Sequence, residues 1–141
     1  MKPVDILLVE DNSGFITLIE EAFKMGKVPS KIHVVENGED AMLFLCKQGK
    51  FADAVTPDIV LLDLNLPKKD GREVLHDIKI DPSLKRIPVI VLTTSDAQQD
   101  VLIAYDNYAN CYIRKPFNLD QFMGVVNKVE EFWLTIVKLP T

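Results

Sequence analysis

The feature that most limits the fold is a repeated alternation between short apolar runs and segments with helical spacing. Apolar runs occur at residues 4–9, 32–35, 59–62, 89–92 and 111–113. The first, third and fourth are rich in Val, Ile and Leu and show no polar alternation. Strands that are covered on both faces of a parallel sheet have this pattern. We therefore expect a parallel sheet with helices packed on both of its faces.

The segments between the apolar runs predict the helices of such a fold. Apolar residues recur at helical spacing in residues 15–23, 41–45, 74–78 and 122–136, and more weakly in 97–108. Helix-length segments between strands imply βαβ crossovers, so the expected class is α/β with a (βα)₅ arrangement. A length of 141 residues suits one domain, so we expect residues 1–141 to form it, with no output domain.

Charge and composition exclude several classes of protein. The net charge of −5 argues against a nucleic-acid binder, because phosphate contacts favour basic domains. No apolar run approaches the roughly 20 residues that cross a bilayer, and acids flank the first run, unlike a signal peptide. The two cysteines, Cys46 and Cys111, fit a reduced protein better than a disulfide framework. We expect a cytoplasmic protein that binds neither DNA nor a membrane.

Polar side chains follow four of the predicted strands at their carboxyl ends. Glu10 and Asp11 follow the first run, Asp63 the third, Thr93 the fourth and Lys115 the fifth. In an open parallel sheet, ligands bind outside the carboxyl ends of the strands. We therefore expect these five residues to share one rim of the sheet and to form the functional site.

The three carboxylates at this rim predict a metal ion. Acids held close together repel one another, and a cation relieves the repulsion. The candidate ligands are oxygens, which favours a hard ion such as Mg²⁺. We expect Asp11 and Asp63 to be direct ligands, together with the backbone carbonyl of Asn65, while Glu10 acts through water.

The remaining rim residues suit a phosphoryl group. A hydroxyl from Thr93 and an ammonium from Lys115 can hold two phosphoryl oxygens while the metal holds the third. Asp63 is the best candidate nucleophile because it lies centrally in the predicted sheet and a carboxylate can form an acyl phosphate.

Four segments in order resemble one known family. They read ILLVEDN, DIVLLDLNLPKKDG, VIVLTTS and CYIRKPF, and they resemble the CheY-like receiver domains of two-component response regulators. The resemblance implies a flavodoxin-like fold with strand order 2-1-3-4-5. It also implies that a histidine kinase phosphorylates Asp63, with Mg²⁺ or Mn²⁺ bound by Glu10, Asp11 and Asp63.

The same resemblance assigns the residues that respond to the phosphate. Lys115 is implied as the phosphate's cation, Thr93 as the switch hydroxyl and Tyr112 as its aromatic partner. The signal is then expected to pass through the face formed by the fourth helix, the fifth strand and the fifth helix. Such a protein is a phosphoacceptor that assists its own phosphotransfer, and not a conventional enzyme.

Three further segments are similar to a narrower group. LNLPKKDGREVL, ANCYI and EEFWLTIVKLP resemble the small response regulators that are paired with cyanobacterial phytochromes. The kinase is therefore expected to be of the phytochrome type. Without an output domain, the response must pass through a partner or a homodimer. The candidate surface consists of Tyr105, Phe132, Trp133, Ile136 and Leu139, and the alternative is a helix end folded onto the core.

Two other functions remain open. An aspartate-nucleophile phosphatase would use the same rim, but such enzymes usually need a second acid two residues after the nucleophile, where this chain has Asn65. A receiver used only as a docking module would not need the complete set of acids, hydroxyl and lysine. A flavin carrier is disfavoured because the acidic first loop would repel a phosphate.

Overall fold

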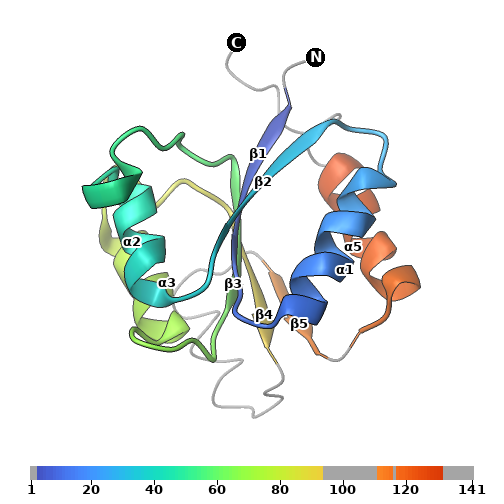
Figure 1. Cartoon of the computed structure of the whole chain (residues 1–141). Helices are drawn as coiled ribbons and strands as arrows, with labels where there is room; N and C mark the ends of the chain where they lie inside the picture. The colour runs from blue at the N-terminus through green and yellow to red at the C-terminus, as the bar shows by residue number, and fades with distance from the viewer. Residues whose placement is uncertain (1–2, 94–110, 116, 132–141) are drawn as a thin grey trace.

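The computed structural model describes residues 3–93, 111–115 and 117–131, apart from the side chains of residues 93, 111 and 112. Within these ranges, five parallel strands form one sheet in the order β2-β1-β3-β4-β5 (Figure 1). The strands are β1 (Val4–Val9), β2 (Ser30–Val35), β3 (Ile59–Asp63), β4 (Val89–Thr93) and β5 (Cys111–Arg114). The helices are α1 (Ser13–Lys24), α2 (Gly38–Cys46), the 3₁₀ helix η1 (Gly49–Phe51), α3 (Gly71–Ile80) and α5 (Leu119–Glu131). The expected α/β class and strand order are confirmed.

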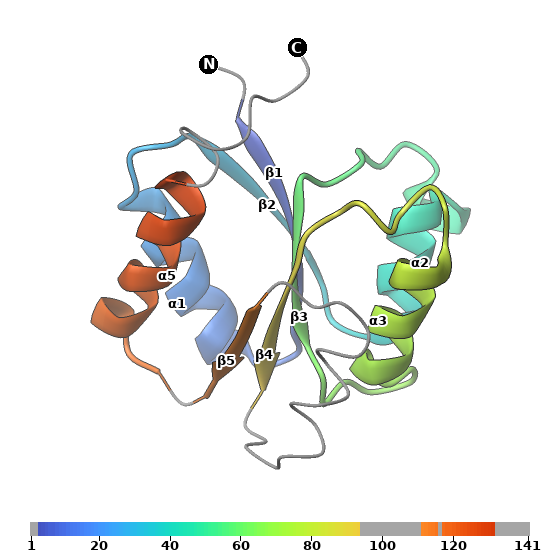
Figure 2. The ribbon, with the colours of Figure 1, turned by 180° about the vertical axis from the view of Figure 1, so that it is seen from behind.

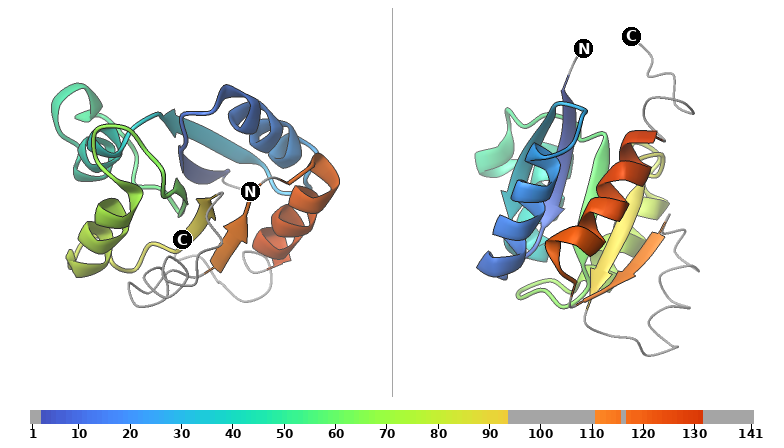
Figure 3. Two further views of the ribbon diagram at one scale, coloured as in Figure 1. Left: turned by 90° about the horizontal axis from the view of Figure 1, so that it is seen from below. Right: turned by 90° about the vertical axis from the view of Figure 1, so that its right-hand side faces the viewer.

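The helices cover the sheet in two layers. Helices α1 and α5 lie on one face and α2 and α3 on the other, as the front and back views show (Figures 1 and 2). Seen along the sheet, the strands form the middle of three layers (Figure 3). Within the described ranges, no helix is both long and apolar enough to cross a membrane.

Strands β1 and β3 are mostly apolar and show no polar alternation because both of their faces are buried. Successive side chains of a strand point to opposite faces. Ile6 and Leu8 therefore pack in the core beneath α1 and α5, whereas Leu7 and Val9 pack in the core beneath α2 and α3. All four side chains are fully buried. Each such burial stabilises the fold by about 1.5–3 kcal/mol. Strand β1 therefore holds the following residues, Glu10 and Asp11, in a fixed position.

The carboxyl ends of the strands lie along one rim of the sheet, at the bottom of Figure 1. Val9 pairs with Leu62 across β1 and β3, and Asp63 pairs with Leu92 across β3 and β4. Helix α1 begins at this rim, where the Asn12 side chain caps it by accepting a hydrogen bond from the Phe15 N–H at 3.1 Å. The register therefore delivers the residues after β1 and β3 to the same place.

Several sequence-based expectations differ from the structure or lie outside it. Strand β2 begins at Ser30, two residues before the apolar run, because backbone pairing with β1 continues through polar residues at the sheet edge. The short helix η1 was not predicted. The helix expected at residues 97–108 lies outside the described residues. So do all five residues of the candidate dimer or partner surface, namely Tyr105, Phe132, Trp133, Ile136 and Leu139.

Candidate metal centre

Three carboxylates gather at the rim, as the sequence predicted. Glu10, Asp11 and Asp63 each offer an oxygen, and these oxygens lie within 4.8 Å of one another. Glu10 extends the pairing of β1 by one residue, since its N–H donates to the carbonyl of Val35 at 3.0 Å. Asp63 is the last residue of β3. Glu10 and Asp63 are buried and Asp11 is exposed, so the cluster has a closed inner side and an open outer side.

Lys115 supplies the positive charge on the closed side. Its side chain is buried immediately after β5, and its ammonium forms an ion pair with Oε1 of Glu10. The same ammonium lies 3.4 Å from Oδ2 of Asp63. One ammonium against three carboxylates leaves an excess of negative charge. The donor set is entirely oxygen, which fits a hard divalent ion such as Mg²⁺ or Mn²⁺.

Burial raises the pKa of Asp63 from 3.8 to about 6. The charge of Glu10 acts in the same direction as burial, while the Asn65 N–H and the Lys115 ammonium act in the opposite direction. The N–H of Asn65 donates to Oδ1 of Asp63 at 3.0 Å and so fixes the orientation of the carboxylate. A divalent cation beside Asp63 would favour the charged form and lower the pKa again.

The loop after β3 holds Asp63 through close backbone contacts. The N–H of Gly71 donates to the carbonyl of Leu64 at 3.0 Å. A Cβ at position 71 would lie 2.2 Å from the carbonyl oxygen of Asp63, so only glycine fits this approach. Lys68 has a positive φ of 66°, and around it the N–H of Lys69 donates to the carbonyl of Pro67 at 2.8 Å in a γ-turn. The chain thus reverses tightly beside the acid cluster.

The structure brings four of the predicted site residues together: Glu10, Asp11, Asp63 and Lys115. For Asn65 it shows the N–H bonded to Asp63, while the ligand role of its carbonyl stays a prediction. Thr93 ends β4 and Tyr112 lies in β5, but their side chains are outside the described part of the chain.

Sequence reasoning missed one residue of this site. The Nζ of Lys115 lies 4.4 Å from the ring centroid of Phe15. Phe15 was interpreted only as part of the apolar face of the first helix. Its position in the first turn of α1 could have indicated this contact, because a helical side chain points back toward the N-terminus of its helix. Here that direction leads to the rim.

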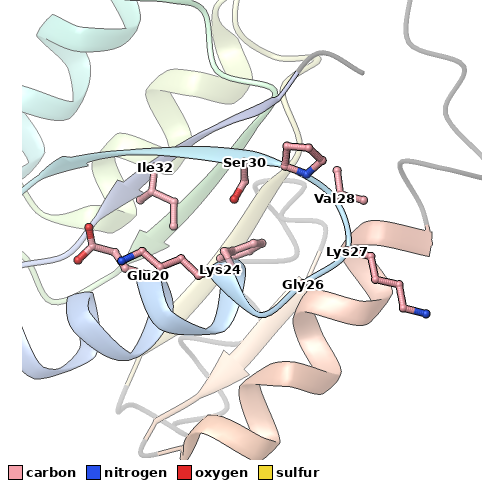
Figure 4. A pocket seen from close by; sticks show the side chains of 9 residues that line it. Glu20, Lys24, Gly26, Lys27, Val28, Ser30 and Ile32 are labelled. Carbon is pink, nitrogen blue, oxygen red and sulfur yellow. The ribbon is translucent and has the colours of Figure 1, made fainter.

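A surface pocket lies at the other end of α1. It is bounded by the end of α1, the loop that follows it and β2 (Figure 4). Its lining residues are Glu20, Phe23, Lys24, Gly26, Lys27, Val28, Pro29, Ser30 and Ile32. None of these residues belongs to the acid cluster, so this hollow is separate from the candidate metal centre.

Comparison with known proteins agrees with the geometry. The family model described as the response regulator receiver domain matches residues 6–127. Response regulator Rcp1 of Synechocystis sp. is 46% identical over 138 residues, which cover 98% of this chain and 94% of that protein.

Solved structures of two such proteins are similar over nearly their whole length. A crystal structure of the phosphorylated cyanobacterial phytochrome response regulator RcpA is 51% identical and has a TM-score of 0.89, with 99% of this chain and 100% of that chain covered. The Mn²⁺-bound form of Rcp1 is 46% identical and has a TM-score of 0.87, again with 99% and 100% covered.

Proposed function

This chain belongs to the response regulator receiver domain family, and from that membership we propose that Asp63 accepts a phosphoryl group from a histidine kinase with Mg²⁺ or Mn²⁺ bound beside it. The observation that carries the proposal is the position of Asp63. Its side chain is 6% exposed, and its carboxylate lies in the acid cluster and faces the Lys115 ammonium at 3.4 Å. A nucleophile, a metal site and a cation for the phosphate are thereby combined.

In the proposed reaction, a carboxylate oxygen of Asp63 attacks phosphorus on the kinase's phosphohistidine. A P–O bond forms, the P–N bond breaks, and the imidazole nitrogen leaves with the electron pair. Glu10, Asp11 and Asp63 would hold the divalent ion, which would supply positive charge to the phosphoryl oxygens. Lys115 exchanges its contact with Asp63 for one with a phosphoryl oxygen, while the Asn65 N–H keeps the carboxylate oriented.

The response to the phosphate is assigned to Thr93 and Tyr112. Thr93 pairs with Arg114 and Val91 pairs with Tyr112, so the two residues occupy adjacent strands at positions of the same parity. We propose that the Thr93 hydroxyl binds the phosphate and that Tyr112 moves with it. The output then passes through the face that contains β5 and α5, to a partner or a second copy of the chain.

The names of the relatives support a phytochrome-type kinase as the phosphate donor. RcpA is described as a cyanobacterial phytochrome response regulator. A structure at 30% identity, with a TM-score of 0.86, is a response regulator in red light signaling of R. palustris. Phosphotransfer from a panel of purified sensor kinases tests this assignment. Equal transfer from kinases unrelated to phytochromes would contradict it.

Incubation with acetyl phosphate and Mg²⁺, followed by intact mass spectrometry, tests the phosphorylation site. We expect one acid-labile phosphate on the wild-type protein, none on Asp63→Asn and none after addition of EDTA. The matched control is Asp53→Asn, an exposed acid outside the cluster, which should be modified like the wild type. A phosphate on Asp63→Asn would refute the site.

The acetyl phosphate experiment and a phosphomonoester turnover assay together separate the two alternative functions. A docking module without phosphotransfer would gain no phosphate at all. An aspartate-nucleophile phosphatase would release phosphate from a phosphomonoester over many turnovers. Asn65 occupies the sequence position, two residues after the nucleophile, where such an enzyme would carry its second acid, and a carboxamide does not act as a general acid. We therefore propose a phosphoacceptor that does not turn over phosphomonoesters.

A further inference from the structure

The Lys115 ammonium lies against an aromatic ring as well as against two acids. Its Nζ is 4.4 Å from the ring centroid of Phe15, and the Lys115 side chain is 4% exposed. A cation over the face of an aromatic ring is attracted by the ring quadrupole, and the attraction grows when water is excluded. The ring therefore adds to the stabilisation that Glu10 and Asp63 give the charged ammonium.

The Phe15 ring is itself held in place by other aromatic rings. It packs on Phe117 with centroids 5.2 Å apart, and Phe117 stacks on Phe122 of α5 with centroids 5.0 Å apart. Phe117 follows Lys115 by two residues, so one short segment of the chain provides both the ammonium and an aromatic ring that packs on Phe15. Lateral movement of Phe15 would therefore break its contact with Phe117.

The backbone of Phe15 is connected to the same acid that binds Lys115. Oε2 of Glu10 accepts from the Asn12 N–H at 3.1 Å, and Oδ1 of Asn12 accepts from the Phe15 N–H at 3.1 Å. Oε1 of Glu10 accepts from the Lys115 ammonium. Contacts therefore run from Glu10 through Asn12 to Phe15, from Phe15 to Lys115, and back to Glu10.

From this closed set of contacts we propose that Phe15 is a positioning residue for phosphotransfer, which holds the Lys115 ammonium beside Asp63 through its ring face. This inference rests on the proposed role of Asp63. Lys115 has four rotatable side-chain bonds, and the ring removes positions in which the ammonium would leave the carboxylate. An ammonium that is already in place costs no reorganisation when charge develops on the phosphoryl group.

The test compares phosphorylation rates with acetyl phosphate and saturating Mg²⁺ in four variants. Phe15→Leu should react about tenfold more slowly than the wild type, because the cation–π contact is lost. Phe15→Tyr keeps the ring and should restore the rate. Replacement of Phe15 by pentafluorophenylalanine nearly keeps the shape of the side chain but removes the negative charge density from the ring face. This variant should therefore react as slowly as Phe15→Leu. Wild-type rates in both slow variants would overturn the proposal.

The fourth variant, Phe23→Leu, is the matched control. Phe23 also lies in α1 and packs on Phe122 with centroids 6.0 Å apart, at the end of the helix away from the rim. Its loss should lower stability and leave the phosphorylation rate unchanged. If Phe23→Leu slowed the reaction as much as Phe15→Leu, core packing would explain the effect and the positioning role would be refuted.

A second readout does not depend on phosphorylation. In the NMR spectrum, the ε-methylene protons of Lys115 should be shifted upfield by the ring current of Phe15. The shift should vanish in Phe15→Leu and persist in Phe15→Tyr and Phe23→Leu. An unshifted Lys115 resonance in the wild type would overturn the inference. A shifted resonance in a protein that acetyl phosphate does not modify would refute the role of Asp63 while leaving the contact established.

Discussion

The ammonium of Lys115 lies 3.4 Å from Oδ2 of Asp63, and both side chains are buried. The same ammonium pairs with Glu10, so a single positive charge is shared by two buried acids. Breaking a buried ion pair by removing one partner costs much more than the pair contributes, since the remaining charge has lost its compensation. The stability of the metal-free protein should therefore depend on Lys115.

We predict that Lys115→Met destabilises the metal-free protein by about 3 kcal/mol, because Glu10 and Asp63 lose their shared cation. Urea unfolding in EDTA at neutral pH measures this loss. Saturating Mg²⁺ should restore part of the stability, because the ion supplies charge to the same acids.

The control for this prediction is Lys50→Met. Lys50 pairs with Asp40 at 3.3 Å, but its side chain is 66% exposed, so water replaces the partner and the change should stay below about 1 kcal/mol. Equal losses for the two variants would show that the rim lysine is not a compensating charge.

The raised pKa of Asp63 predicts a pH-dependent metal affinity. Burial raises this pKa to about 6, and a proton on the carboxylate competes with the ion. Affinity for Mg²⁺ should be constant above pH 7 and should fall by about tenfold per pH unit well below 6. Calorimetric titrations at several pH values measure this. A constant affinity from pH 5 to pH 8 would contradict it.

The same pKa fixes the sign of the linkage in the metal-free protein. A carboxyl with a raised pKa binds its proton more tightly when folded than when unfolded. The contribution of Asp63 to the free energy of unfolding should therefore fall as the pH rises from 3.8 to about 6, because the folded protein loses the proton that it binds more tightly. Asp63→Asn removes the titrating group and should abolish this contribution, which a comparison of unfolding curves across that range would show.

The site could be predicted because it depends on topology more than on detail. The apolar runs of β1 and β3 are long enough to identify, and Glu10, Asp11 and Asp63 follow them directly. In a parallel sheet all carboxyl ends share one edge, so the acids are expected at one rim, and the pairing of β1 with β3 brings them together there. The strand order could not be predicted in this way, because no periodicity in the sequence specifies it. The expected order came only from the family resemblance.

The contact between Phe15 and Lys115 was beyond sequence reasoning for a physical reason. It depends on how α1 packs against the segment between β5 and α5, where Phe15 meets Phe117, and such packing is set by the fit of side chains. The start of β2 was missed for a related reason. Ser30 and Lys31 join the sheet through backbone hydrogen bonds, which do not depend on an apolar side chain.

We predict that Gly71→Ala destabilises the protein by about 2 kcal/mol. The new Cβ would lie 2.2 Å from the carbonyl oxygen of Asp63 and 2.6 Å from the Cα of Leu64, and backbone cannot move aside cheaply. Gly124→Ala is the matched control in α5, where nothing lies within 4 Å of the added Cβ. It should stabilise the helix by about 0.5–1 kcal/mol. Thermal unfolding that ranked the two variants in the opposite order would refute the close approach.

Glu130 gives a prediction about a part of the molecule that lies away from the rim. This buried acid of α5 accepts a hydrogen bond from the Val28 N–H at 2.6 Å, in the loop between α1 and β2. Glu130→Ala leaves the buried N–H without its acceptor and should cost about 2 kcal/mol. Glu130→Gln keeps an acceptor and should cost less. Exchange of the Val28 amide with deuterium should accelerate in the same order.

The rate of phosphorylation shows whether the hydrogen bond between Glu130 and Val28 affects the site around Asp63. Glu130 contacts none of the rim residues in the hydrogen bonds and ion pairs described for it, so Glu130→Ala should react with acetyl phosphate at the wild-type rate while it remains folded. Glu21→Ala, which removes an exposed acid from α1, controls for the change in net charge. A slow reaction in Glu130→Ala alone would mean that the α1–β2 loop is coupled to Asp63, because α1 extends from that loop to the rim.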